Sequence, residues 1–81
     1  MTIQQRQEEI DKKHRIYLDE ILKAMRHGDW KRVCIKTGLE QTYVSHSFRR
    51  VGSKHHLTVV QAALEVIEER MASYEAINQL M

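Results

Sequence analysis

The spacing of apolar residues divides the chain into four helical segments. From Ile10 to Met25, apolar residues recur every three or four positions, which places them on one face of an amphipathic helix. Because this spacing is continuous and contains neither glycine nor proline, a single uninterrupted helix is indicated. We predict that this first helix runs from near residue 5 to Arg26 or His27.

Glycines mark the boundaries of the next two segments. Gly28 suits a helix end, and Asp29 is expected to cap the following helix because its carboxylate can accept free backbone N–H groups. A short second helix is predicted from Trp30 to about Thr37. Gly38 interrupts it, and the third helix is predicted from about Glu40 to Val51, where the next glycine stops it.

The last segment begins with a possible helix cap. Thr58 and Gln61 stand three residues apart, which is the spacing of a capping box. An apolar stripe then continues from Val60 to Tyr74 at helical intervals. The pattern predicts a final helix over about residues 58–78.

The predicted fold class is therefore all-α. We expect one four-helix domain over residues 1–81, in which a central helix-turn-helix at about 30–51 is flanked by two longer helices. The 81 residues include no proline, suffice for a single domain and bury too little surface for a deep catalytic cleft. No residue pattern indicates a nucleophile, an acid–base pair or a phosphate-binding loop, so we predict that the protein is not an enzyme and has no catalytic residues.

Cysteine content and hydropathy limit the compartment. The single cysteine, Cys34, cannot form an internal disulfide, so nothing requires an oxidising environment. No apolar run approaches the roughly 18 residues that a membrane span requires. We expect a soluble cytoplasmic protein without a membrane partner.

Positive charge is concentrated in the middle of the chain. The net charge is only +2, but residues 29–56 carry six basic side chains against two acidic ones. Residues 57–81 carry one basic side chain against four acidic ones. A local positive excess on a compact motif is expected where a protein contacts phosphates, although a solvated surface has the same composition.

The central segment also meets the local demands of two closely crossing helices. Cys34 is a small residue four positions before the turn, and Gly38 can adopt the positive φ that the turn needs. Val44 and Phe48 are spaced to anchor the second helix. Trp30 is expected to wedge into the core against the first or the last helix rather than to stack on a base.

The segment "RVCIKTGLEQTYVSHSF" resembles the helix-turn-helix of bacterial and phage repressors, including the lac and lambda repressor types. The similarity covers roughly a quarter of the chain, and the "TGLEQTYVSHSF" portion carries most of it. Thr37 and Ser47 are polar where those families usually place aliphatic residues, and Glu40 replaces a short Ser or Thr cap.

The resemblance implies that the second helix of the motif enters the DNA major groove with its outward residues near base edges. Gln41, Thr42 and His46 are then the candidates for base contacts. The candidates for phosphate contacts are Lys31, Arg32, Tyr43, Ser45, Arg49, Arg50 and Lys54.

The histidines do not suggest a metal site, because Cys34, His46, His55 and His56 lack the close pairing of zinc ligands. We predict no metal and no cofactor. His55 and His56 are interpreted as part of a solvated loop or, alternatively, as a source of positive charge near DNA at mildly acidic pH.

One helix-turn-helix contacts too little DNA for strong specificity, so a homodimer is expected on half-sites about 10 bp apart. The last helix is the candidate dimer surface, although the same stripe is also suited to the intramolecular core. The candidate dimer residues are Val60, Leu64, Ile67, Met71, Tyr74 and Ile77.

Three functions remain open from the sequence. The first is a sequence-specific DNA-binding transcriptional regulator of bacterial or phage type, with double-stranded DNA as its partner. The second is the DNA-recognition part of a phage packaging or recombination complex. The third is a protein-interaction module that uses a helix-turn-helix fold without binding DNA.

Overall fold

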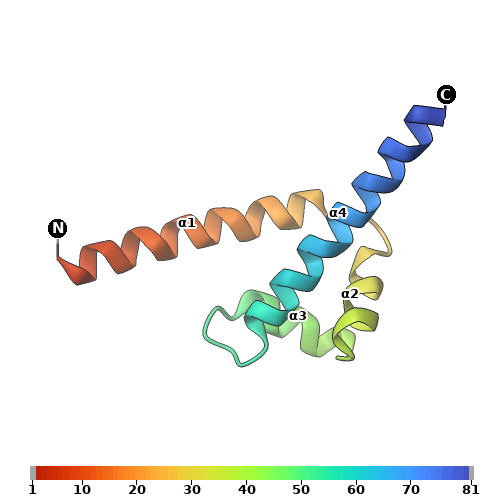
Figure 1. Ribbon diagram of the computed structural model, residues 1–81. Helices are drawn as coiled ribbons and strands as arrows, with labels where there is room; N and C mark the ends of the chain where they lie inside the picture. The colour runs from red at the N-terminus through yellow and green to blue at the C-terminus, as the bar shows by residue number, and fades with distance from the viewer. Residues whose placement is uncertain (1, 81) are drawn as a thin grey trace.

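The computed structural model describes residues 2–80, and this part of the chain folds into four helices (Figure 1). They are α1 (Ile3–Ala24), α2 (Asp29–Thr37), α3 (Gln41–Arg49) and α4 (His56–Leu80). The predicted all-α class is confirmed, with two long helices flanking two short central ones. None of the helices in residues 2–80 combines the length and apolarity needed to cross a membrane.

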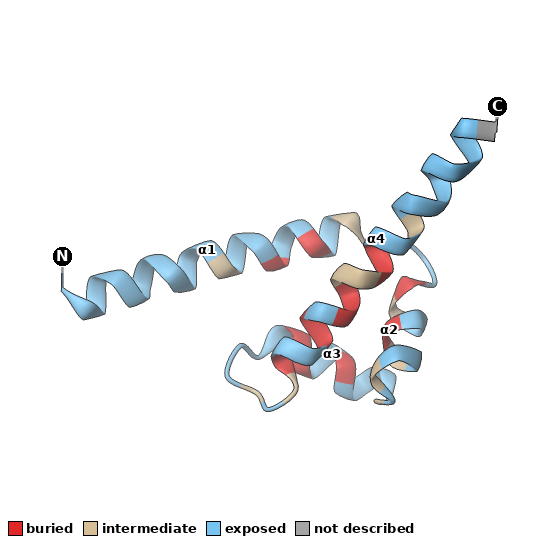
Figure 2. Cartoon of the chain, viewed as in Figure 1, coloured by how far each residue is buried: buried red, intermediate tan, exposed pale blue. Residues whose placement is uncertain are grey.

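Helix α4 is the centre of the fold, because α1, α2 and α3 all pack against it. Its residues Val59, Ala63 and Val66 are completely buried. The buried positions lie where the helices cross and are nearly absent from the two outer ends (Figure 2). The apolar core consists of Leu18, Ile21, Val33, Val44, Phe48, Val59, Val60, Ala62, Ala63, Val66 and Ile67.

Two helix ends project beyond this core (Figure 1). Every described residue from 2 to 13 is exposed at the amino-terminal end of α1, and every residue from 71 to 79 is exposed at the carboxy-terminal end of α4. The molecule is correspondingly elongated, with extents of 53 × 30 × 15 Å. Both ends lack the tertiary packing that usually supplies most of a helix's stability.

The first helix begins earlier and ends earlier than predicted. Thr2 is its N-cap and forms a capping box with Gln5, in which the Thr2 hydroxyl accepts the Gln5 N–H at 3.3 Å. The Gln5 side chain in turn accepts the Thr2 N–H at 3.1 Å. The helix ends at Ala24, because the next residue, Met25, is already extended.

The prediction that Asp29 caps α2 is wrong. Gly28 is the N-cap, in a left-handed conformation with φ +90°, and Asp29 is the first helical residue. The turn at Gly28 directs the Asp29 carboxylate back over the loop, where it accepts the Arg26 N–H at 2.7 Å. The same carboxylate lies 3.3 Å from Nε of Arg70 on α4, so Asp29 is a buried tertiary contact rather than a cap.

The predicted capping box at Thr58 is also wrong. Helix α4 starts at His56, so Thr58 lies inside the first helical turn and is exposed. His56, the first residue of the helix, is held in the interior by its side chain. At the other side of that loop, α3 ends at Arg49, two residues before the predicted end at Val51.

Candidate nucleic-acid interface

The turn between α2 and α3 is built as the sequence predicts. Gly38 has φ +72°, which L side chains rarely adopt, and its N–H donates to the Cys34 carbonyl at 2.8 Å. The Thr37 hydroxyl donates to the Val33 carbonyl at 2.8 Å and accepts the Leu39 N–H at 3.3 Å. Thr37 therefore closes the turn through hydrogen bonds, which explains why this position is polar.

One face of α3 is fixed in the core. Val44 is 1% exposed and Phe48 is 2% exposed, as their predicted anchoring role requires. Trp30 at the start of α2 packs against the core, with its ring edge-on to Phe48 at a centroid distance of 5.3 Å. The aromatic partner of Trp30 thus lies on α3, whereas the sequence had pointed to the first or last helix.

A histidine pair links α1, α3 and α4 on the buried side of α3. His56 is 1% exposed, and its Nδ1 lies 2.8 Å from the carbonyl oxygen of Ser47. Because a carbonyl only accepts, Nδ1 of His56 donates to it. In the neutral imidazole Nε2 then accepts from His14 Nε2–H on α1, at a distance of 2.9 Å. The interpretation of His56 as a solvated loop residue is therefore wrong. Its hydrogen-bond partner Ser47 is buried as well.

The opposite face of α3 is polar and exposed. Gln41, Thr42 and His46, the three candidates for base contacts, line one shallow surface depression together with Ser45 and Arg49. The helix repeat brings these five side chains to the same side, because Gln41, Ser45 and Arg49 follow at intervals of four residues, as do Thr42 and His46. The structure therefore gathers all three base-contact candidates and two phosphate-contact candidates on one surface, which we call the α3 face.

The remaining phosphate-contact candidates lie around the α3 face or away from it. Tyr43 is half exposed and stands edge-on to His55 at 5.6 Å, beside the loop that leads to α4. Arg50 and Lys54 are exposed in that loop, and Lys31 is exposed on α2. Arg32 is placed differently, in a depression that it shares with residues of the projecting end of α4.

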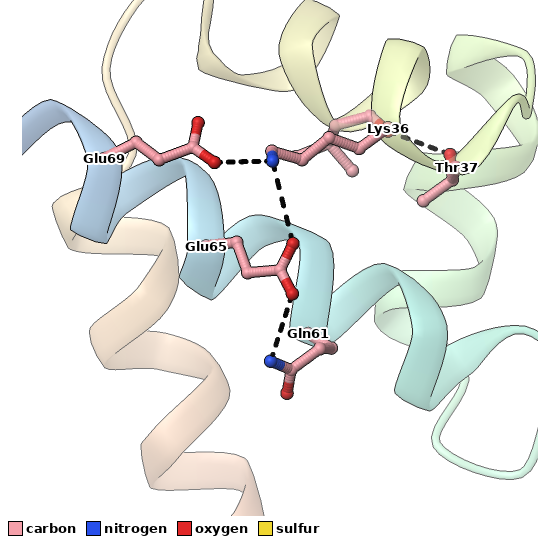
Figure 3. Close-up of polar contacts among 6 residues, drawn as sticks. Lys36, Thr37, Gln61, Glu65 and Glu69 are labelled. Atoms are coloured by element: carbon pink, nitrogen blue, oxygen red, sulfur yellow. Dashed lines mark hydrogen bonds and ion pairs between the residues drawn. The ribbon is translucent and has the colours of Figure 1, made fainter.

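The positive charge of the central segment is partly neutralised by α4. Lys36 of α2 donates to Glu69 at 2.6 Å, and its ammonium nitrogen lies 3.7 Å from a carboxylate oxygen of Glu65. Figure 3 shows the ammonium group between the two carboxylates. The hydrogen bond that Lys36 donates to Glu69 raises the pKa of Lys36 above its usual 10.5. Neither acidic partner was predicted from the sequence. Lys36 was assigned to the positive central segment of the sequence, and Glu65 and Glu69 to the acidic last segment.

A second ion pair joins α4 to the loop between α1 and α2. Arg70 faces the Asp29 carboxylate through Nε and donates through Nη2 to the Ala24 carbonyl. Asp29 is 4% exposed, so this pair is shielded from solvent. Acid and base thus cancel here too, whereas Arg49 on the α3 face has no ion-pair partner among residues 2–80.

The candidate dimer residues divide into two groups. Val60 and Ile67 are buried in the core at 7% and 8% exposure, and Leu64 is half-buried. The other three lie on the projecting end of α4, where they are at least half exposed; they are Met71, Tyr74 and Ile77. The stripe predicted for dimerisation therefore serves the core first and leaves only its last part on the surface.

Within the described residues, no group of three or more His, Cys, Asp or Glu side chains is placed to hold a metal ion. Comparison of the chain with protein-family models, with curated proteins and with solved structures finds no match. What points to a function is the turn between α2 and α3 together with the exposed polar side chains of the α3 face.

Proposed function

We propose that this protein binds double-stranded DNA sequence-specifically and acts as a small transcriptional regulator, with α3 as the recognition helix. The observation that carries the proposal is the α3 face, a continuous exposed polar surface on the second helix of a tight helix-turn-helix. Its opposite side is locked into the core by Val44 and Phe48. Such a helix presents its outer side chains rigidly, as reading of base edges in the major groove requires.

Three exposed side chains of α3 are assigned to the bases. The amide of Gln41 can make paired hydrogen bonds with adenine N6 and N7, and the methyl group of Thr42 can pack against a thymine methyl. His46 follows Thr42 by one helical turn and can donate or accept at a base edge. All three are exposed, so their donors and acceptors remain available.

Phosphate contacts are assigned to the cations that surround this surface. Arg49, which has no ion-pair partner among the described residues, stands at the end of α3, and Arg50 and Lys54 follow in the adjoining loop. Lys31 on α2, with Ser45 and Tyr43 on α3, completes the proposed footprint. We leave Arg32 out of it, because it lines the depression beside α4. These contacts would fix the register on the duplex without reading its sequence.

A homodimer would place two α3 helices on a two-fold DNA site. The projecting end of α4 is the proposed contact, because Met71, Tyr74 and Ile77 are exposed there at 56%, 61% and 54%. We expect Ile77→Glu to reduce dimerisation, whereas Ile16→Glu, at a similarly exposed position on α1, should not. Light scattering at micromolar concentration tests this; a wild-type protein that is strictly monomeric removes the dimer proposal.

Selection of bound sequences from a random duplex pool tests the function itself. A short palindrome supports a regulator, and a recovered sequence without two-fold symmetry favours a packaging or recombination role. Fluorescence anisotropy against salt then measures the phosphate contacts, and Arg49→Ala should lower the slope of log K against log salt by about one. Arg6→Ala, on the exposed start of α1, is the matched control and should leave the slope unchanged.

An affinity indifferent to salt and to Arg49 would end the DNA proposal. The protein would then be better described as an interaction module whose projecting helices bind another protein. The observation that favours this second candidate is the exposure of apolar residues on both ends, Ile3 and Ile10 on α1 as well as Met71 and Ile77 on α4.

A further inference from the structure

A small cavity of about 160 Å³ lies at the side of α3, between that helix, the end of α1 and the start of α2. Its apolar lining comes from all three helices: Leu22 of α1, Trp30 of α2, and Val44 and Phe48 of α3. Three polar side chains of the α3 face also line it: Gln41, Ser45 and Arg49. Val44 and Phe48 are buried and form the floor, whereas the three polar residues are exposed and form the mouth.

The cavity follows from how α1 is attached. Among the described residues, α1 packs against α4 and makes no backbone contact with α3, so a space remains between them. Leu22 closes one side of that space but is itself 46% exposed. Trp30 and Phe48 meet edge to face at an interplanar angle of 83° and supply two aromatic surfaces. An apolar cavity of about 150 Å³ is large enough for a benzene ring.

The mouth of the cavity supplies a positive charge and neutral hydrogen-bonding groups. Arg49 has no ion-pair partner among residues 2–80, and its planar guanidinium matches a carboxylate with two parallel hydrogen bonds. The Gln41 amide and the Ser45 hydroxyl add further donors at the same opening. An apolar ligand alone would cover Arg49 without satisfying it, which is unfavourable.

We infer that this cavity binds a small aromatic carboxylate, with the ring against Trp30, Phe48 and Val44 and the carboxylate on Arg49. For a ligand of this size we expect a Kd on the order of 1 mM. The inference concerns a ligand site and stands independently of DNA binding.

One consequence of the site does rest on the proposed function. Gln41, Ser45 and Arg49 belong to both the mouth of the cavity and the α3 face. A bound carboxylate would therefore occupy Arg49 and compete with a phosphate, so that ligand and DNA each weaken the binding of the other. The cavity would thus give the regulator an effector site at its recognition helix.

Trp30 is the single tryptophan of the chain and lines the cavity, so its fluorescence reports ligand binding directly. Benzoate is the probe, and benzamide, which has the same ring without the charge, is the control ligand. We expect a saturable change of Trp30 emission with benzoate and at least tenfold weaker binding of benzamide. Arg49→Met should weaken benzoate at least tenfold and leave benzamide nearly unchanged.

A second variant fills the cavity without touching its charge. Leu22→Phe adds volume at a half-exposed position, so the fold should be kept, which circular dichroism verifies, and benzoate binding should be lost. A linear, non-saturating response that is equal in wild type and Arg49→Met overturns the inference. The inference is also overturned if Trp30 emission changes with protein concentration alone and benzoate no longer binds at high protein concentration, because a second copy of the protein then fills the cavity.

The DNA arm of the experiment is kept separate. Benzoate should raise the apparent Kd for the selected duplex in wild type but not in Leu22→Phe, where the cavity is filled. If no DNA is bound while benzoate still saturates Trp30, the function fails and the ligand site stands. If DNA is bound and benzoate does not saturate, the ligand site fails and the function stands.

Discussion

The buried histidine at the start of α4 provides the sharpest prediction about stability. His56→Ala removes an imidazole that is 1% exposed and deletes the hydrogen bonds to the Ser47 carbonyl and to His14. Truncating a buried ring costs about 3 kcal/mol or more. Loss of the hydrogen bond to the Ser47 carbonyl, which keeps only the Ser53 hydroxyl as a donor at 3.3 Å, adds about 1 kcal/mol. The expected loss is about 4 kcal/mol, against a total stability of roughly 4–12 kcal/mol for a chain of this length.

Two neighbours provide the matched controls. His14→Ala removes only the half-buried partner of the pair and should cost about 1 kcal/mol. His55→Ala, which affects a half-buried ring beside Tyr43, should cost less than His56→Ala. Urea unfolding followed by circular dichroism measures all three. If His56→Ala costs no more than His55→Ala, the ring is solvated and the described coupling of α1, α3 and α4 is refuted.

Three further predictions concern the turn and the two ion pairs. Gly38→Ala meets no described atom within 4 Å, but φ +72° should cost about 1 kcal/mol, visible as a lower melting temperature. Asp29→Asn should destabilise by about 2 kcal/mol in urea, because Arg70 loses its partner while only 20% exposed. Lys36→Met should lower the free energy of unfolding slightly at neutral pH, and the difference from wild type should be smaller in high salt. Because the pKa of Lys36 is raised, its contribution is complete below pH 10.5 and is lost as the pH rises further, so an alkaline titration should bring wild type and variant together.

The helices and the turn could be predicted because their causes are local. Repeated apolar residues define α1 and α4, and Gly38 stands where the chain must take a positive φ. The exposed side of α3 followed from the same helix repeat once Val44 and Phe48 were assigned to the core. Such features depend on residues only a few positions apart.

The features that sequence reasoning missed are contacts between distant residues. His14 and His56 are 42 positions apart, and Asp29 at the start of α2 contacts Arg70 on the last helix. His56 was therefore assigned to a loop and Asp29 to a helix cap, because the partner of each lies far away in the sequence. One signal was available for His14, which lies on the apolar stripe of α1 and therefore faces inward.

The cavity beside α3 was missed for a related reason. Trp30, Leu22 and Phe48 come from three helices. The space between these side chains depends on the angle at which α1 crosses α4. Apolar periodicity predicts which side of each helix is buried, but it does not predict where two helices diverge. Crossing angles depend on how the side chains of both helices interlock.

The proposed reading of bases by α3 is tested most directly by a single comparison of affinities. Gln41→Ala and wild type are titrated with the selected duplex, with duplexes changed at single base pairs, and with an unrelated duplex. The proposal predicts a loss of about 1–3 kcal/mol of discrimination at one base-pair position, with little change on the unrelated duplex. An equal loss on every duplex, or none on any, contradicts it.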